Sequence, residues 1–424
     1  MSFQQGLSGL NAASKNLEVI GNNVANASTV GFKQSQAVFA DVYARSLSSG
    51  GGAQVGIGTK MSQVVQQFTQ GNVSTTNNPL DLSINGDGFF CIEQNGTPAY
   101  TRNGQFYLDD EGYIVNTTGA YLKGYQVNAN GAVQNSGNET SRLKMDFSDL
   151  PPRATENAEL VINLDSRSQP INITPLPDPM PVPPPDPMPE PPVPFDAANP
   201  ASYHYTTSVP VYDSLGNMYS LQTYYARRDT GWDVYAAFDG QVLNGGGVIT
   251  QHQFDANGKL SSPTGIINLQ LTPPDAAVMN VQLNFNKMTQ FGSGSNAAHL
   301  HSDGYMPGRL AGFSIGSDGT ILGRYTNGES AVLGAVALTT FTNVNGLEPL
   351  GDNNWAETPN SGPPNTGIAG TGTLGMLRAN TVEESNVDLT AELVRMITAQ
   401  RNYQANAQTI KTQDQVMQTL VNMR

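Results

Sequence analysis

The C-terminal run, residues 386–424, constrains the fold of this chain more than any other stretch. Its apolar side chains recur in alternating steps of three and four residues, the heptad pattern of a helix that packs along another helix. Ser385 and Asp388 form a helix-capping signature at its start, and no Gly or Pro interrupts it. The sequence therefore predicts one helix longer than the roughly 8 to 20 residues of an ordinary core helix.

The predicted seam consists of two heptad columns. One column holds Leu389, Met396, Tyr403, Ile410 and Met417, and the other holds Leu393, Gln400, Ala407, Asp414 and Val421. Its polar members, Gln400 and Asp414, either set the register of a partner or face water, and the pattern favours neither. Burying each apolar side chain contributes about 1.5 to 3 kcal/mol, whereas ordering the backbone costs about 1 to 2 kcal/mol per residue. Such a helix therefore needs a partner.

The N-terminus offers that partner. Phe3, Leu7, Leu10, Leu17 and Val24 follow the same spacing, and few charged residues interrupt them. Two apolar helical ends around a polar middle predict that the ends pair with each other and with neighbouring copies when the protein assembles. These N-terminal residues and the apolar seam residues of the C-terminal run are the predicted assembly interface.

The middle of the chain predicts β-structure. Short alternating segments are separated by Asn-Gly and Asp-Gly turns, which are typical of antiparallel hairpins. The predicted fold is a multi-domain α+β protein in which two mainly antiparallel β domains are nested between helices that form a coiled-coil domain. The predicted boundaries are 1–30 and 384–424 for the helical domain, 31–78 and 359–383 for linkers or hinges, 79–146 and 303–358 for an inner β domain, and 147–302 for an outer β domain with a Pro-rich insertion at 170–200.

The composition of the Pro-rich insertion favours a stiff polyproline spacer over a docking peptide. The composition of the Gly-rich segment at 46–58 favours a flexible joint.

Composition excludes several classes of function. With a formal charge of -14 and no cluster of Lys and Arg, the chain is a poor partner for nucleic acid or an anionic membrane. The single cysteine, Cys91, excludes an internal disulfide, and its apolar surroundings favour a buried inert thiol over a nucleophile. We also expect no cleavable signal peptide and no membrane-spanning segment, because the N-terminus lacks a basic start and no apolar stretch is long enough.

Three motifs suggest chemistry without supporting it. Residues 370–375 fit the dinucleotide fingerprint in letters only, because no strand precedes them, so we interpret them as linker. His299, His301 and Asp303 could share a strand face, but without another strong ligand nearby a solvent-facing strand is favoured over a metal site. Asp81 begins a calcium-like loop whose final glutamate is missing, so a strand and turn are favoured. We therefore expect no enzyme activity, no metal and no cofactor.

Long stretches of the chain resemble the hook protein family of the bacterial flagellum. The resemblance rests on residues 22–33, 84–90, 100–104, 346–358 with Trp355, and 385–424 with its Gln400-Arg401-Asn402-Tyr403 motif. The terminal motifs alone also fit the rod proteins of the same axial family, whereas the outer β domain favours the hook. The Pro-rich insertion departs from the family pattern.

The resemblance implies a structural subunit that is exported without a cleavable signal peptide and polymerises into a curved, flexible extracellular tube. That tube couples rod to filament and transmits torque as a universal joint. The implied partners are further copies of the chain, the hook cap protein, the distal rod protein, the hook-filament junction protein and the flagellar type III export apparatus, with no nucleic acid and no membrane insertion. The alternatives are another axial protein, such as the distal rod or the junction protein, or a secreted β-rich adhesin.

Overall fold

The computed structural model describes residues 2–42, 56, 58–128, 131–133, 139–171, 194–262 and 265–423. Most of the predicted Gly-rich joint, and residues 172–193 of the Pro-rich insertion, lie outside this range. The chain forms two compact units. Unit 1 comprises Met1–Phe147, Gly312–Arg324 and Ser330–Arg424, and unit 2 comprises Ser148–Ala311 and Tyr325–Glu329.

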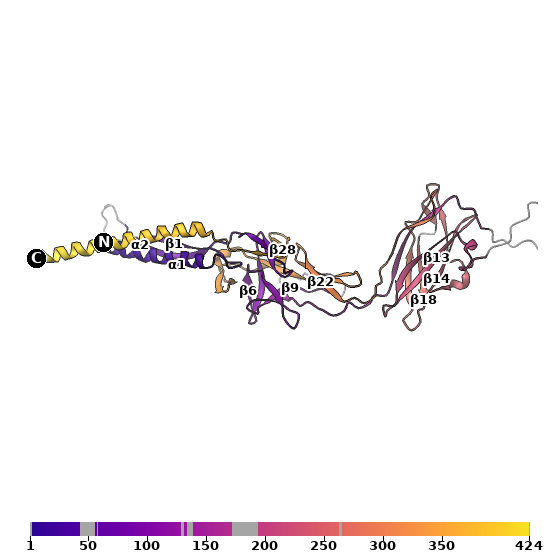
Figure 1. The fold of residues 1–424 in the computed structure, drawn as a ribbon, viewed down its shortest axis with the longest axis horizontal. Coiled ribbons are helices and arrows are strands. Elements are labelled where there is room, and N and C mark those ends of the chain that lie inside the picture. The colour runs from indigo at the N-terminus through magenta and orange to yellow at the C-terminus, as the bar shows by residue number, and fades with distance from the viewer. Residues whose placement is uncertain are drawn as a thin grey trace, which may run out of the picture. The chain divides into compact units, whose positions relative to one another are not determined.

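Both ends of the chain are helical, and the helices lie side by side in unit 1 (Figure 1). The N-terminal helix is α1 (Ser2–Ala25) and the C-terminal helix is α2 (Leu389–Asn422). The pair is antiparallel, because Gly6 near the start of α1 faces Ile410, whereas Asn23 near its end reaches Glu392. The prediction of paired terminal helices is confirmed, and no helix in the described part of the chain is long and apolar enough to cross a membrane.

The start of α2 differs slightly from the prediction. Asp388, rather than Ser385, is the N-cap residue, and its carboxylate accepts hydrogen bonds from the backbone N–H groups of Thr390 and Ala391 at 2.8 and 3.1 Å. Two donors of the first turn are thereby satisfied by a negative charge that suits the helix dipole. The helix therefore begins at Leu389.

Paired strands occupy both segments in which the sequence predicts linkers. In the first segment, β1 (Ser35–Val42) and β2 (Gly58–Gln66) form an antiparallel hairpin beside α1 (Figure 1). Farther along, β3 (Val73–Thr75) pairs with β29 (Thr381–Glu383), and β28 (Met376–Ala379) pairs with β4 (Leu82–Asn85). The segments flanking the helices, predicted as linkers or hinges, are therefore held by backbone ladders to each other and to the β body.

The β body of unit 1 is a twelve-stranded sheet around one main core. Its path runs β22-β23-β24-β9-β5-β6-β26-β25, with β7, β8, β10 and β27 joined at its sides. These strands are β5 (Phe89–Gln94), β6 (Thr97–Thr101), β7 (Phe106–Leu108), β8 (Ile114–Asn116), β9 (Tyr121–Tyr125), β10 (Ser141–Arg142), β22 (Leu310–Ile315), β23 (Thr320–Tyr325), β24 (Ser330–Thr340), β25 (Glu348–Gly351), β26 (Asn354–Ala356) and β27 (Asn365–Ile368). The β5–β6 turn places Asn95 and Gly96 at φ 52° and 82°, the left-handed geometry that the Asn-Gly pair predicts.

Unit 2 is built from two sheets that enclose a second core. The first contains β11 (Asn157–Asp165), β18 (Ile266–Leu271), β19 (Met279–Asn284), β20 (Thr289–Phe291) and β21 (Asn296–Ser302), and the second contains β12 (Tyr205–Tyr212), β13 (Met218–Arg228), β14 (Gly231–Phe238), β15 (Gln241–Val242), β16 (Thr250–Phe254) and β17 (Leu260–Ser262). Strand β14 is buried along its whole length. Pairing is mostly antiparallel, but β11 is parallel to β19 and β20.

Candidate assembly surface and the buried polar junction

The contact between α1 and α2 is built from small residues. A Cβ atom at Gly6 would lie 3.2 Å from Cγ1 of Ile410, and one at Gly9 would lie 2.6 Å from Oδ1 of Asn406. Ala13 on α1 is buried, as is Ala399 on α2. Small side chains let two helix backbones approach closely, so this face fits tightly but buries little apolar area.

The large apolar residues of the predicted interface lie mostly outside that contact. On α2, Met396, Ala407 and Ile410 are half-buried, whereas Leu389, Leu393, Tyr403, Met417 and Val421 are exposed. On α1, Phe3 and Leu7 are exposed, and Leu10, Leu17 and Val24 are half-buried. The side of α2 turned toward α1 instead carries Glu392, Ala399 and Asn406. The helices therefore present apolar residues that the subunit itself does not cover.

A further apolar surface lies on the first half of α2 and on the hairpin. Leu393, Val394 and Ile397 are 47%, 59% and 51% exposed, and Phe39 and Val64 on the hairpin are also exposed. Contiguous exposed apolar side chains are rare on monomeric proteins and usually mark interaction sites. We use "apolar terminal surface" for Phe3, Leu7, Val38, Phe39, Met61, Val64, Leu389, Leu393, Val394, Ile397, Tyr403, Val416, Met417, Val421 and Met423.

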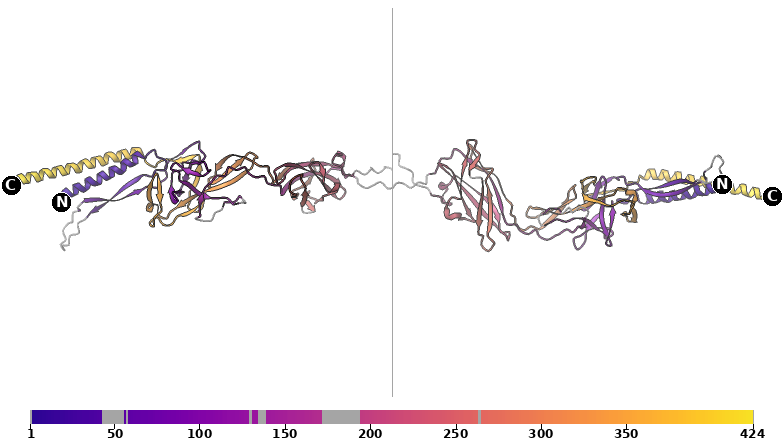
Figure 2. Two further views of the ribbon diagram at one scale, coloured as in Figure 1. Left: turned by 90° about the horizontal axis from the view of Figure 1, so that it is seen from below. Right: turned by 180° about the vertical axis from the view of Figure 1, so that it is seen from behind.

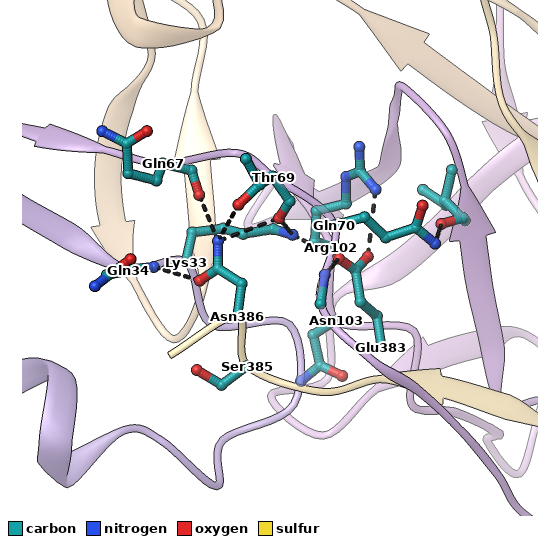
Figure 3. Close-up of polar contacts among 12 residues, drawn as sticks. Lys33, Gln34, Gln67, Thr69, Gln70, Arg102, Asn103, Glu383, Ser385 and Asn386 are labelled. Atoms are coloured by element: carbon teal, nitrogen blue, oxygen red, sulfur yellow. Dashed lines mark hydrogen bonds and ion pairs between the residues drawn. The ribbon is translucent and has the colours of Figure 1, made fainter. Parts of the chain in front are cut away.

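A buried ion cluster joins the helical ends to the β body (Figure 3). The Lys33 ammonium donates to Glu383 Oε1 at 2.5 Å and to the Thr69 carbonyl at 2.8 Å. Arg102 donates to Glu383 Oε2 at 3.2 Å. All three charged side chains are almost completely inaccessible to solvent. Two cations thus share a single carboxylate inside the protein.

Desolvation dominates the electrostatics of this cluster. Burial lowers the pKa of Lys33, because removal from water outweighs the attraction of Glu383, and the neighbouring Arg102 lowers it further. Burial likewise lowers the pKa of Arg102. Removing one member of a buried ion pair typically costs about 3 to 5 kcal/mol, because the remaining charge is left uncompensated. Glu383 is therefore the residue on which the cluster depends most.

Asn386 connects three segments next to this cluster (Figure 3). Its Oδ1 accepts from the backbone N–H of Gln34 at 2.7 Å, and its Nδ2 donates to the Gln67 carbonyl at 2.8 Å and to Oγ1 of Thr69 at 2.9 Å. One side-chain amide thus serves as both donor and acceptor between chain segments. The segment preceding α2 is fixed to the N-terminal segment by this residue.

Asn23 and Glu392 extend the network into the helix pair. Asn23 accepts from the Ser35 N–H at 2.9 Å and donates to the Ser35 carbonyl at 2.8 Å, so it ties the end of α1 to the start of β1. Glu392, which is 1% exposed, accepts from Gln34 Nε2 at 2.5 Å and from Arg395 at 2.7 Å. We define the buried junction as Asn23, Lys33, Gln34, Arg102, Glu383, Asn386 and Glu392.

Gly31 lets the N-terminal segment enter the buried junction. Its φ is 73°, and a Cβ there would lie 2.6 Å from the backbone nitrogen of Asn103. Its own N–H donates to the Glu383 carbonyl at 2.8 Å. Only glycine accommodates both the left-handed backbone and this close approach.

The junction residues have no local sequence signal that marks them as a cluster, although several lie in the motifs that carry the family resemblance. Lys33 ends the 22–33 stretch, Arg102 lies within 100–104, and Asn386 follows Ser385. Their charges are scattered along the chain, so no local pattern shows that they meet. The close helix contact had a local signal in the small residues Gly6, Gly9 and Ala13, whose spacing places them on one helix face.

Cys91 and two of the motifs that suggested chemistry have defined surroundings in the structure. Cys91 is buried in β5, and burial raises the pKa of its thiol to about 11. His299 and His301 stack on β21 with ring centroids 6.0 Å apart, but the Asp303 carboxylate instead accepts backbone N–H groups from Glu156 and Asn157. Within the described ranges, no group of three or more His, Cys, Asp or Glu side chains is placed to hold a metal ion. Residues 370–375 form the turn between β27 and β28.

Four families match successive parts of the chain. Residues 3–33 match the flagella basal body rod protein family, and residues 83–174 match the flagellar hook protein FlgE/F/G D1 domain. Residues 184–305 match the flagellar basal body protein FlaE D2 domain, and residues 378–423 match the flagellar basal body rod FlgEFG protein C-terminal family. These matches cover both helical ends and much of both units.

Relatives that match this chain over nearly their whole length are flagellar hook proteins. The flagellar hook proteins FlgE of Escherichia coli K12 and of Salmonella typhimurium LT2 are each 39% identical to this chain, with all of both chains covered. The flagellar hook protein FlgE of Borreliella burgdorferi is 30% identical and covers all of this chain and 99% of its own. The crystal structure of the Helicobacter pylori flagellar hook protein FlgE2 shares the fold over 73% of this chain, with a TM-score of 0.53 and 16% identity.

Proposed function

Because this chain belongs to the flagellar hook protein family and is a structural, non-enzymatic subunit of the extracellular flagellar hook, we propose that its apolar terminal surface is the part that polymerises. The observation that carries this proposal is the exposure of Leu389, Leu393 and Met417 on a helix already paired with α1. Exposed apolar side chains on a helix favour contact with another copy, and a repeated contact of this kind builds a polymer.

The charge distribution supports self-association at the ends. The charged residues of α1, Lys15 and Glu18, form an ion pair at 2.7 Å, and acidic and basic residues nearly balance on α2. The formal charge of -14 therefore lies almost entirely outside the helices. Copies can bring their helical ends together with little repulsion, whereas the β units carry the like charge that opposes non-specific association.

We further propose that the helices become fully ordered only on assembly. The intramolecular contact is formed by small residues such as Gly6, Ala13 and Ala399, so it buries little apolar area. The backbone entropy of a 34-residue helix is much larger than such a contact offsets. Intersubunit burial of the leucines would supply the remaining free energy, as in other coupled folding and binding.

The buried junction gives this polymer a mechanical role. It connects α1, β1 and the start of α2 to the β body of unit 1 through buried ion pairs and backbone ladders. A load applied to the helices would therefore pass to the β body without an intervening flexible linker. We expect the hook to transmit torque through this junction while it bends by rigid-body motion elsewhere in the subunit.

The proposed partners follow from this role. Further copies of the chain are the main partner. The hook cap protein, the distal rod protein, the hook-filament junction protein and the flagellar type III export apparatus are proposed partners at the ends of the tube and during its growth.

Electron microscopy tests the proposal directly. The purified full chain is concentrated or salted, and we expect curved tubes. A chain lacking the last thirty residues should form none, although its hydrogen-exchange protection in the β units should match that of the full chain. A substitution at an exposed α2 position outside the apolar terminal surface, Gln408→Asp, serves as control. Tubes formed by the truncated chain, or none by the full chain, would refute the proposal.

Circular dichroism tests the coupled folding. Dilute monomer should give less helical signal than α1 and α2 require, and the signal should rise on polymerisation. A dilute monomer with the complete signal would contradict this part of the proposal.

A further inference from the structure

A groove lies beside the helix pair of unit 1, at the end where α2 begins. It has a volume of about 430 Å³ and lies between α1, α2 and β1. Its lining is mixed. Apolar side chains come from all three elements, with Ile20, Phe39 and Val394 among them, and polar side chains such as Asn16 and Asn402 contribute the rest. Because a helix with its side chains is about 10 Å across, the groove suits a few side chains from one helix face rather than a whole helix.

An unpaired helical segment projects from the opposite end of the same pair. Gly6 faces Ile410, and α1 begins about one turn before Gly6, so the antiparallel partner of its first residue lies near Asp414. From there α2 continues to Asn422, a projection of about 12 Å at about 1.5 Å per residue. Figures 1 and 2 show α2 extending past the N-terminal end of α1. We call residues 415–422 the overhang.

One face of this segment matches the chemistry of the groove. Met417 and Val421 are one turn apart, on one side of the helix, and are 61% and 72% exposed. Asp414 lies on the same side, one turn before Met417. At the groove, the side chain of Arg395 is 56% exposed and bound to Glu392. An apolar pair preceded by an acid therefore complements a groove that has apolar side chains and a base at its edge.

We propose that the overhang of one copy inserts Met417 and Val421 into the α1–α2–β1 groove of a second copy, with Asp414 near Arg395 of that copy. This inference rests on the proposed polymerisation and specifies one contact of it. The occupant is a second copy because every copy carries the groove at one end of its helix pair and the overhang at the other. Two different complementary surfaces on one molecule give a head-to-tail contact, which builds an open helical polymer wherever its rotation does not close into a ring.

Cross-linking between separately labelled copies tests the contact. Thr398 lines the groove and is exposed, so Thr398→Cys reports on the acceptor. Val421→Cys reports on the donor, and Gln415→Cys, on the opposite side of the overhang, is its matched control. The native Cys91 is buried and does not compete. Equal amounts of an acceptor variant and a donor variant are polymerised and treated with a short bismaleimide.

We expect tubes from both mixtures, with dimers cross-linked at least about tenfold more in the 398–421 mixture than in the 398–415 mixture. The double variant Met417→Asp/Val421→Asp should raise the critical concentration for tube formation at least about tenfold, and Gln415→Asp should not. These side chains are exposed, so the monomer should remain folded, which hydrogen exchange checks. Tubes that form with equal cross-linking in both mixtures, or normally from the double Asp variant, overturn this contact and leave polymerisation intact. Failure of the unsubstituted chain to form tubes refutes the proposed function itself.

Discussion

Replacing Glu383 by Gln should severely destabilise unit 1. The side chain keeps its size but loses the charge that faces two buried cations, Lys33 at 2.5 Å and Arg102 at 3.2 Å. Without it, Lys33 retains the Thr69 carbonyl and Arg102 retains the Gly86 carbonyl. Neutral acceptors replace only part of the lost stabilisation, so we expect a loss of about 3 to 5 kcal/mol, or on the order of 10 °C in melting temperature.

A second substitution distinguishes the stability lost through charge imbalance from the stability lost through altered packing. Lys33→Met removes the cation whose pKa burial lowers and leaves the Arg102–Glu383 pair balanced. It should therefore cost less than Glu383→Gln, by at least about 2 kcal/mol, although it alters more atoms. Glu348→Gln, on an exposed strand, is the matched control and should change stability by less than about 0.5 kcal/mol.

Urea denaturation of the dilute full chain measures these differences. Trp355 is buried in unit 1 and donates to Gln66, so its fluorescence reports on this unit once Trp232 of unit 2 is replaced by Phe. A free energy of unfolding for Glu383→Gln within about 1 kcal/mol of the parent would refute the reasoning. So would a greater loss from Lys33→Met than from Glu383→Gln.

Three further predictions test the helices and unit 2. Gly21→Ala should raise the melting temperature of polymerised protein in circular dichroism, because a Cβ there meets nothing within 4 Å and alanine favours helix by about 1 kcal/mol. Gly9→Ala should raise it less, because its Cβ displaces the Asn406 side chain from the helix contact. Asp388→Ala should cost about 1 kcal/mol and speed hydrogen exchange in the first turn of α2, and unchanged exchange would contradict its capping role. His252 is fully buried, and desolvation lowers its pKa from 6.5 to about 4. The stability that its neutral form permits is complete above pH 6.5 and is lost by about 3 kcal/mol as the pH falls to 4. The hydrogen-exchange protection factors of β14 and β16, taken relative to the intrinsic exchange rate at each pH, should therefore fall in acid, and the fall should diminish in His252→Phe.

The sequence predicts the parts of this fold that have a local signal. Periodicity predicts both terminal helices, and the Asn95-Gly96 turn predicts the β5–β6 hairpin. The Asp318-Gly319 pair likewise marks the turn between β22 and β23. In each of these places, neighbouring residues alone determine the backbone.

The face of α2 that meets α1 does not follow from the heptad periodicity. The heptad pattern ranks faces by apolar content and therefore selects the side with Leu389 and Leu393. The structure selects the face on which Gly6 and Gly9 allow close approach, so those leucines stay exposed. Periodicity detects that a helix has an apolar face, but it does not identify which partner covers that face.

The strands in the predicted linkers were missed because their pairing is non-local. Thr381–Glu383 pairs with Val73–Thr75, a register that depends on segments from opposite parts of the chain. Both strands are short and lie among turn residues, so they carry little periodicity of their own. The buried junction is also non-local, because the carboxylate that pairs with Lys33 belongs to Glu383, near the other end of the sequence.

The ion cluster can form only after most of the chain has been synthesised, because its carboxylate lies near the C-terminus. Lys33 emerges early and Glu383 only near the end, so no incomplete product that stops before Glu383 can neutralise its own buried cation. Any shortened polypeptide of that kind is left with a charge it must either expose or bury at great cost. The buried cluster can therefore form only in a chain that extends at least through Glu383.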